Sequence, residues 1–363
     1  MVRFYLKETK KITLGLINLV EFPFVLNYLE RVPWSPIHFV ADVTNHCNLR
    51  CIMCYPQHDN YRQSVSVDWT LDQFKRYIDT FHPRSVAFGA TGEPLLNPEI
   101  NDMLYYSKKH GCKNIISTNG VMLEKSLAVL ENITTLKLSF DAATDDTYRK
   151  IRNNPNFYTI LNNIKRAREL GVDVRFEYVI ISLNHHEISE ILKLAKSLNV
   201  QHVFYRIFQD EKLPKDLADM LRNIPTLNDD LEKASLVAKE LEISTNLSEL
   251  VQKKTYLNLT YNAQPIVDDR RKHVCLLPWT QLFANSDGDC GFCCNLSWLT
   301  HLYTGNLFKG DDVWNGSKMR EYRRMFANRE NYDNFVECSE CEPMNFSNLL
   351  KWSRLMPSWW KIV

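Results

Sequence analysis

The sequence has no excess of charge of either sign: 44 lysines and arginines stand against 43 aspartates and glutamates, a net charge of +1 over 363 residues. Nucleic-acid-binding proteins usually carry a basic patch or stripe, so we expect no nucleic acid partner and instead a small-molecule or peptide substrate. Glycine and proline are also scarce, at 11 and 14 residues. With an apolar share of 45%, this composition is that of an ordinary globular protein, long enough for a large and a smaller domain.

A recognisable signal peptide is lacking too, because the charged start MVRFYLKETKK leads into an apolar stretch that no small-residue cleavage site closes. We therefore expect a cytoplasmic protein. The stretch itself, residues 12–29, contains Asn18, Glu21 and Pro23, which are costly in hydrocarbon, so it predicts a packing or membrane-surface helix rather than a span. The tail, residues 346–363, predicts an amphipathic helix packed on the body, with peripheral membrane contact as the alternative.

Short apolar strands alternate with amphipathic helices from residue 36 onward, which predicts parallel βαβ units. Two helices are well marked: Thr70 is the expected N-cap of a helix over 71–81, and apolar residues recur at helical spacing over 157–170, up to Gly171. Six strands are expected, at residues 37–43, 86–88, 114–117, 136–140, 174–181 and 202–206.

The alternation stops near residue 210, and a charged, helix-like segment and then a cysteine-rich segment follow. The predicted domains are an N-terminal helical extension, an α/β core, a helical linker, a cysteine-rich domain and an amphipathic tail, at residues 1–35, 36–225, 226–270, 271–345 and 346–363.

Ten cysteines in a reducing compartment argue against disulfides, and their grouping into closely spaced sets indicates metal ligands. The first set, Cys47, Cys51 and Cys54, follows the first predicted strand with the spacing CxxxCxxC. Three thiolates around a 4Fe–4S cube leave one iron open for a substrate or cofactor, whereas an electron-transfer cluster is usually closed by a fourth. Structural zinc is the alternative, but it also takes four ligands, and no further cysteine lies nearby in sequence.

This loop resembles the hallmark of the radical S-adenosylmethionine (SAM) superfamily. The resemblance covers roughly residues 36–210 and implies a partial (β/α)6 TIM-like barrel as the radical SAM core of an α/β fold. It further implies a SAM-binding 4Fe–4S cluster, cleavage of SAM to a 5′-deoxyadenosyl radical, and an external electron donor of the flavodoxin or ferredoxin type. Gly92, Glu93 and Pro94, after the second strand, resemble the turn that holds the SAM amino group, although alone they would indicate an ordinary turn.

The resemblance assigns further SAM contacts to polar residues near the ends of later strands: Thr118, Asn119, Ser139, Asp141 and Asn184. Arg206, at the end of the sixth strand, is a candidate partner of the SAM carboxylate or an ordinary surface arginine. One position departs from the family pattern, since Met53 replaces the aromatic residue usual before the third cysteine, and Tyr55 follows that cysteine instead. Both are candidate neighbours of the adenine, because a methionine sulfur also packs against a ring.

The second cysteine set begins with Cys275-Leu-Leu-Pro-Trp, continues with Gly288 five residues before Cys293, and ends with Cys338-Ser-Glu-Cys341. It resembles the SPASM/twitch extension of radical SAM enzymes, whose Gly-x4-Cys step selects Cys293 over its neighbour. Since no cysteine follows Cys341, the resemblance implies the shorter form, with one auxiliary 4Fe–4S cluster on these four cysteines. A structural zinc knuckle is the alternative.

Three cysteines remain outside both sets. Cys112 is expected to be a buried apolar residue. Cys290 and Cys294 are expected to pack beside the second set, and the alternatives are a cluster ligand or a thiol that donates hydrogen to the substrate.

The reaction implied by two clusters is hydrogen abstraction followed by oxidation, with the auxiliary cluster taking the second electron and the site kept from water. Residues 1–35 are too few for a separate peptide-recognition domain, which favours a small molecule such as a sugar or aminocyclitol. Two alternatives stay open: a maturase that crosslinks, oxidises or epimerises a ribosomal peptide, and a non-catalytic metal-binding scaffold.

Overall fold

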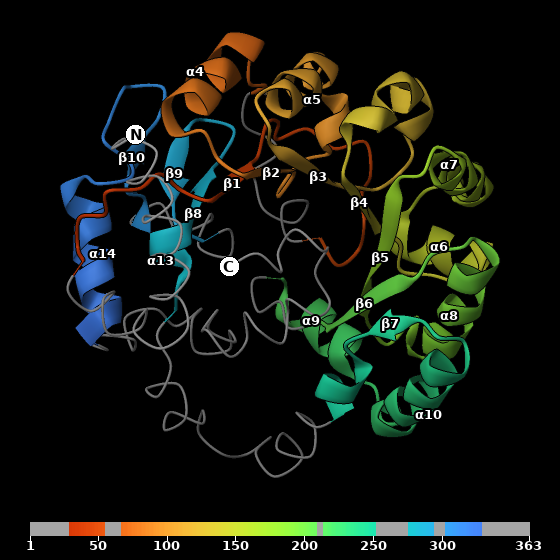
Figure 1. Ribbon diagram of the computed structural model, residues 1–363. Helices are drawn as coiled ribbons and strands as arrows, with labels where there is room; N and C mark the ends of the chain where they lie inside the picture. The colour runs from red at the N-terminus through yellow and green to blue at the C-terminus, as the bar shows by residue number, and fades with distance from the viewer. Residues whose placement is uncertain (1–28, 55–66, 209–212, 252–274, 294–301, 329–363) are drawn as a thin grey trace, which may run out of the picture. The chain divides into compact units, whose positions relative to one another are not determined.

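The computed structural model describes five stretches of the chain, at residues 29–54, 67–208, 213–251, 275–293 and 302–328 (Figure 1). The chain divides into two compact units: a core unit of residues 38–263 and 284–287, and a terminal unit of residues 1–37, 264–283 and 288–363. The domain boundaries expected from the sequence stay predictions. Within the described stretches, no helix is both long enough and apolar enough to cross a membrane; residues 12–28 and the tail lie outside them.

The core unit is built on parallel strands in sequence order, each paired with the next. They are β1 (His38–Ala41), β2 (Ser85–Phe88), β3 (Lys113–Thr118), β4 (Thr135–Ser139), β5 (Asp173–Ile180), β6 (His202–Ile207) and β7 (Ser244–Thr245). The intervening helices are α4 (Leu71–Phe81), η2 (Pro94–Leu96), α5 (Ile100–Lys109), η3 (Leu123–Asn132), α6 (Asp145–Arg152), α7 (Phe157–Glu169), η4 (His185–Glu187), α8 (Ile188–Ser197), α9 (Lys215–Arg222) and α10 (Leu227–Glu240).

All six expected strands are present, with bounds within two residues of the predictions. Helix α4 begins after Thr70, whose hydroxyl accepts a hydrogen bond from the Gln73 N–H, as a capping residue does. Helix α7 ends close to Gly171, whose φ of +79° is the left-handed conformation expected after a helix. The structure adds a seventh parallel strand, β7, which the sequence does not predict because two residues are too few to show an apolar pattern.

Strand β5 shows how the helices cover this sheet. Its residues alternate between buried and half-buried, with the aromatic side chains of Phe176 and Tyr178 fully buried. Parallel sheets that are covered on both faces have nearly continuous apolar strands, so a strict alternation means that one face is packed and the other is not. The packed face carries most of the hydrophobic stabilisation, about 1.5–3 kcal/mol for each large apolar side chain.

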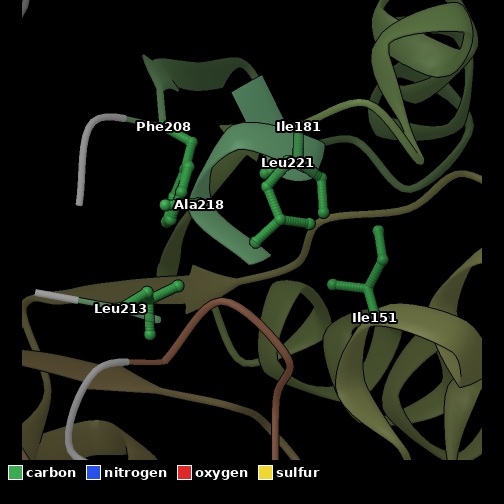
Figure 2. Packing of buried hydrophobic residues seen from close by; sticks show 6 residues of the cluster. All are labelled: Ile151, Ile181, Phe208, Leu213, Ala218 and Leu221. Carbon is green, nitrogen blue, oxygen red and sulfur yellow. The ribbon is translucent and has the colours of Figure 1, made fainter. Parts of the chain in front are cut away.

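An apolar cluster closes the carboxyl ends of β5 and β6 (Figure 2). Its buried members are Ile151, Ile181, Phe208, Leu213, Ala218 and Leu221. Helix α9 belongs to this cluster and is also fixed by its backbone, since the Ser182 N–H donates to the Leu221 carbonyl. Met53, from the loop after β1, packs against the cluster, so apolar contacts hold this loop against the strand ends.

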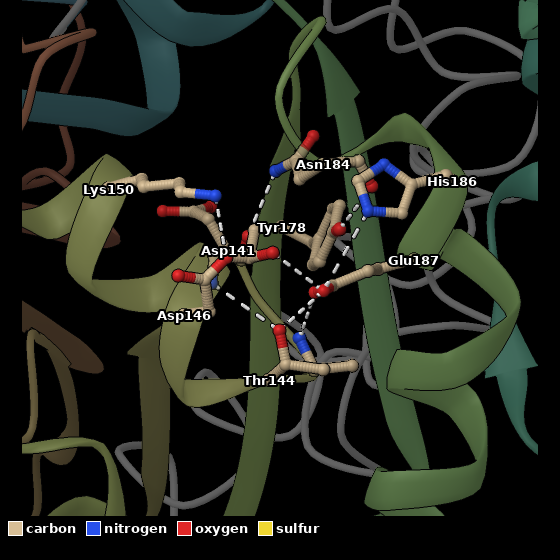
Figure 3. Close-up of polar contacts among 10 residues, drawn as sticks. Asp141, Thr144, Asp146, Lys150, Tyr178, Asn184, His186 and Glu187 are labelled. Atoms are coloured by element: carbon tan, nitrogen blue, oxygen red, sulfur yellow. Dashed lines mark hydrogen bonds and ion pairs between the residues drawn. The ribbon is translucent and has the colours of Figure 1, made fainter.

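A buried carboxylate, Glu187, joins the start of α6 to the start of α8 (Figure 3). It accepts hydrogen bonds from the Ala143 N–H at 2.6 Å, the Thr144 hydroxyl at 2.6 Å and the Thr147 hydroxyl at 2.7 Å. Thr144 is the N-cap of α6. The carboxylate therefore fixes both the position and the first turn of this helix, where negative charge is favourable.

The terminal unit contains α13 (Leu277–Thr280), β8 (Gln281–Ala284, whose last residue is counted in the core unit), β9 (Asp289–Gly291), β10 (Gly305–Asn306) and α14 (Ser317–Asn328). β10 pairs with β9 in antiparallel fashion. The Trp34 indole donates to the Trp279 carbonyl at 3.0 Å, and Trp314 donates to the Trp34 carbonyl at 2.6 Å. Buried Arg323 donates to the Pro278 carbonyl at 2.9 Å. Segments distant in sequence are thus joined around the Pro-Trp motif.

The substitution Glu187→Ala should lower the free energy of unfolding by about 3 kcal/mol, because it leaves the donors that this carboxylate accepts from buried without a partner. Glu124→Ala is the control: its side chain is 66% exposed in a surface ion pair with Arg166, and its loss should change stability by less than about 0.5 kcal/mol. Urea unfolding followed by circular dichroism measures both. Equal midpoints for the two variants would contradict the assigned role of Glu187.

Candidate functional site

The loop after β1 holds the first cysteine set, and none of its three cysteines is in a disulfide. Cys51 is buried, while Cys47 and Cys54 are half-buried. Two backbone hydrogen bonds shape the loop, from Cys54 N–H to the Cys51 carbonyl and from Ile52 N–H to the Ile151 carbonyl. The thiols are therefore held on one short loop at the carboxyl end of the sheet, where barrels of this type build their sites.

The chemistry around these thiols fits an anionic iron–sulfur cluster. The Leu49 N–H donates to the Cys47 sulfur and the Arg152 guanidinium donates to the Cys51 sulfur, each at 3.5 Å. Donors and positive charge directed at ligand sulfurs stabilise metal-bound thiolates. In the described parts of the chain, no three Cys, His, Asp or Glu side chains are grouped as ligands of one metal ion. A cube differs in this respect, because each of its cysteines binds a separate iron.

The turn after β2 places Glu93 in the interior. Its carboxylate accepts hydrogen bonds from the Thr118 hydroxyl at 2.6 Å and the Asn119 N–H at 2.8 Å. Thr118 is the last residue of β3, and Asn119 follows it. Burial raises the pKa of Glu93 to about 7, against the opposing effect of these donors. Pro94 then opens η2, with Glu93 as its N-cap. A buried carboxylate of this kind is suited to an ammonium group.

Backbone packing fixes this turn against the cysteine loop. A β-carbon on Gly92 would lie 2.2 Å from the Thr44 carbonyl oxygen, so only glycine fits. The Glu93 N–H donates to the His46 carbonyl at 2.6 Å. Directly after β3, the Asn119 amide donates to the Asn48 side chain at 2.8 Å and approaches the Cys47 sulfur at 4.0 Å. The structure therefore brings together the first three motifs that the sequence singled out.

Asp141, after β4, is fully buried and ion-paired with Arg152. Its other oxygen accepts the Val179 N–H at 2.7 Å. Burial raises the pKa of Asp141, against the lowering effect of the guanidinium. Burial would lower the pKa of Arg152, but the charges of Asp141 and Cys51 outweigh it and raise the pKa, so the guanidinium stays charged.

Sequence reasoning missed Arg152, which links Asp141 to the cysteine loop. A signal was present, because Tyr148, Ile151 and Arg152 recur at the i, i+3, i+4 spacing of the buried face of α6. Arg149 and Lys150, by contrast, form exposed ion pairs within the helix. A charged residue in register with the apolar face is the pattern that indicates a buried partner.

The remaining candidate SAM contacts differ in their surroundings. Ser139 is half-buried at the end of β4. Asn184 is buried, and its amide bonds the Asp141 and Val179 carbonyls and the Ile181 N–H, so it holds the turn after β5 (Figure 3). Arg206 is 63% exposed and pairs with Glu177 at 3.5 Å.

Two predicted neighbours of adenine have different outcomes. Met53 is partly buried against the apolar cluster. Tyr55 lies outside the described residues. As for Ser139, Asn184 and Arg206, a contact with SAM stays a prediction for both.

The described part of the second set contains Cys275, which is buried just before α13, and Cys293, which is half-buried just after β9. Cys294, Cys338 and Cys341 lie outside the described residues. Cys290 is fully buried and its thiol donates to the Gly288 carbonyl at 3.5 Å, which favours packing over ligation. Burial strongly raises its pKa. Cys112 is buried, as expected for a packing residue, and its thiol donates to the Pro83 carbonyl at 3.1 Å.

Comparison with known families gives two matches along the chain. Residues 42–195 match the model of the radical SAM superfamily, and residues 275–342 match that of an iron–sulfur cluster-binding domain, SPASM. Among curated proteins, the chain is similar to a GTP 3′,8-cyclase of Clostridium acetobutylicum, with 30% identity over 46% of this chain and 54% of the cyclase. The chain thus spans about half the length of this relative.

Solved structures resemble more of the chain. SuiB of Streptococcus suis bound to its precursor peptide SuiA superimposes with a TM-score of 0.63 at 17% identity, covering 91% of this chain and 76% of SuiB. Native anSMEcpe with bound SAM superimposes with a TM-score of 0.58 at 16% identity, covering 85% of this chain and 86% of that one. Similarity at this identity shows the fold alone, and together with the two family matches it confirms the predicted α/β radical SAM core.

The two matched domains imply 4Fe–4S clusters, one of them auxiliary, together with SAM, and so favour the cofactor prediction over zinc. The order of the motifs, the site at the strand ends and the two matches agree. The chain belongs to the radical SAM superfamily and carries a SPASM domain C-terminal to its radical SAM domain.

Proposed function

We propose that this protein cleaves SAM at the cluster site on Cys47, Cys51 and Cys54 and uses the resulting radical to abstract hydrogen from a substrate. The observation that carries the proposal is the convergence of this loop with the buried carboxylate Glu93 and the buried cation Arg152. When bound and reduced, the cluster supplies the electron that splits SAM into methionine and a 5′-deoxyadenosyl radical. The protein's own residues bind and orient SAM and exclude water around it.

Opposite charges in the site match the two ends of the methionine part of SAM. Glu93 would bind the ammonium group of SAM. Thr118 and Asn119 would hold the Glu93 carboxylate in place through the hydrogen bonds described above. Arg152 would bind the carboxylate, since its Nε is buried without a hydrogen-bond partner among the described residues. We prefer Arg152 to Arg206 for this role because Arg206 is exposed. Gly92, Pro94, Ser139, Asp141 and Asn184 would shape the same pocket.

For the second cluster, we propose Cys275, Cys293, Cys338 and Cys341 as ligands, since the matched SPASM domain spans all four. An auxiliary cluster would accept the electron left on the substrate after hydrogen abstraction, which makes the overall reaction an oxidation. Two electrons leave the substrate in total: one with the hydrogen atom, the other to this cluster. An external donor of the flavodoxin or ferredoxin type would reduce the SAM cluster.

Two substrate classes fit this chemistry. The first is a small molecule such as a sugar or aminocyclitol, and the similarity to GTP 3′,8-cyclases gives it a small-molecule precedent. The second is a ribosomal peptide, favoured by one observation: a structure similar over 91% of this chain was solved with its precursor peptide. A short precursor reading frame beside the gene would favour the peptide, and sugar-biosynthesis genes the small molecule.

The central prediction is that the anaerobically reconstituted protein forms 5′-deoxyadenosine from SAM when dithionite is added. The triple variant Cys47→Ala, Cys51→Ala, Cys54→Ala should form none and should retain about half of the iron and sulfide, because the second cluster stays in place. Chromatography and iron analysis measure the two quantities. A wild-type protein without product would leave the metal-binding scaffold as the better interpretation, and a triple variant without iron would disprove the second cluster.

Gly92→Ala should disrupt the first cluster, because the new β-carbon forces the Thr44 and His46 carbonyls away just before Cys47. We expect the iron content to fall toward that of the triple variant and SAM binding to be lost. Gly111→Ala is the control for the close contact, since no heavy atom lies within 4 Å of the added carbon there. Its φ of +81° adds a backbone strain that Gly92, whose φ is not positive, does not have, so an effect confined to Gly92→Ala comes from the contact. Unchanged iron in Gly92→Ala, measured beside this control, would show that the close approach is not needed for the cluster.

SAM affinity should decrease as the pH falls below about 7, where Glu93 becomes protonated and loses its attraction for an ammonium group. The sign follows from burial, which raises the pKa of Glu93, so the ionised form needed for binding predominates only above that pKa. Well below the pKa, the decrease should approach about tenfold per pH unit, as for a single coupled proton. Glu93→Gln should bind SAM weakly and with a flatter pH profile. Equilibrium dialysis tests this, and an equally steep profile in Glu93→Gln would assign the titration to another group.

A further inference from the structure

The face of the sheet that the helices leave unpacked carries three charged side chains on neighbouring strands: Lys137 on β4, Glu177 on β5 and Arg206 on β6. Each lies at a half-buried or exposed position of its strand's alternation. An apolar side chain would fill these positions if another layer of the core unit packed on this face. The charges therefore give this face of the sheet a polar surface, opposite the apolar face that the helices cover.

The three side chains form one connected group. Glu177 lies 3.4 Å from the Lys137 ammonium and 3.5 Å from the Arg206 guanidinium, so a single carboxylate serves two cations. The side chains are 20%, 37% and 63% exposed for Glu177, Lys137 and Arg206. The guanidinium also lies 5.5 Å from the centre of the Phe204 ring, which limits its freedom. The group has a net charge of +1.

Stability alone explains this group poorly. Partly exposed ion pairs contribute about 0–1 kcal/mol, and two cations on one carboxylate repel each other. The same arrangement is well suited to a second anion, which would neutralise the surplus charge and give each cation a partner.

The group also lies near the proposed site. Glu177 is in register with Ser139, the last residue of β4. Two residues further on, the Val179 N–H donates to Asp141, the partner of Arg152. Since a strand rises about 3.3 Å per residue, Glu177 is about 7 Å along the strand from the level of Asp141. A substrate on this face would reach the strand ends where SAM is proposed to bind.

We propose that Lys137 and Arg206 bind an anionic group of the substrate, a carboxylate or a phosphate, and that Glu177 is the internal counterion that yields to it. The proposal rests on the proposed function in one respect, because it takes this face as the substrate side of the site. It narrows the substrate to an acidic one, such as an acidic peptide side chain, an acidic sugar or a phosphorylated molecule.

The test is equilibrium dialysis of the reconstituted full-length protein in the presence of SAM, with radiolabelled glutarate in one arm and pyrophosphate in the other. We expect saturable binding of at least one probe, and the preferred probe separates a carboxylate from a phosphate substrate. Lys137→Gln and Arg206→Gln should each weaken binding about tenfold, as expected for loss of one charged hydrogen bond. Glu177→Gln should strengthen it, because the competing carboxylate is gone.

Arg149→Gln is the control, since this arginine is 51% exposed and paired with Asp145 on the far side of α6 from the buried face. It should bind the probes like the wild type, and circular dichroism verifies that all variants are folded. The opposite effect of Glu177→Gln is the decisive readout, because loss of a merely structural ion pair would not increase affinity. Absence of binding for both probes, or binding that is unchanged in Lys137→Gln and Arg206→Gln, overturns the proposal.

Formation of 5′-deoxyadenosine, measured on the same samples, separates this proposal from the proposed function. Product without probe binding refutes the anion site alone. Probe binding without product refutes SAM cleavage and leaves the anion site standing.

Discussion

The contact between Arg152 and the cysteine loop is the interaction on which the arrangement of the site depends. A guanidinium buried this deeply is stable only with partners that offset its desolvation, and here these are the carboxylate of Asp141 and the sulfur of Cys51. One partner belongs to the end of β4 and the other to the loop after β1. The charge of Arg152 therefore links the carboxyl end of β4 to the loop after β1, although its partners Asp141 and Cys51 are about 90 residues apart in the sequence.

The position of that charge depends on helix α6, and α6 depends on Glu187. The carboxylate holds the first turn of the helix, and Arg152 lies in its last turn. A helix of 8 residues is marginal by itself, so tertiary contacts must fix its length and direction. Asn184, in the turn after β5, also donates to the Asp141 carbonyl and so ties this turn to the end of β4. The position of the cysteine loop therefore depends, through these buried polar side chains, on the positions of α8 and of the turn after β5.

The parallel core was predictable from the sequence because its strands are short apolar runs separated by amphipathic helices, and each of these patterns is local. The places of the cysteine loop after β1 and of the Gly-Glu-Pro turn after β2 were predictable for the same reason. Strand β7 was not, since two residues carry no periodicity and only their pairing with β6 defines the strand. Nor was Arg152, because its partners are 11 and 101 residues away in sequence and a helical pattern does not reveal what a buried charge contacts.

The alternation along β5 has a consequence for how this protein can change. Because successive side chains point to opposite faces, residues that hold the helices and residues that face the open side occupy separate positions of the same strand. A substitution at Glu177 leaves the packing of Phe176 and Tyr178 against the helices intact, so the surface beside the reactive centre can be remodelled while the fold is kept. On the proposed substrate side, the residue that would influence substrate selection and the residues that maintain the fold then alternate along one eight-residue strand.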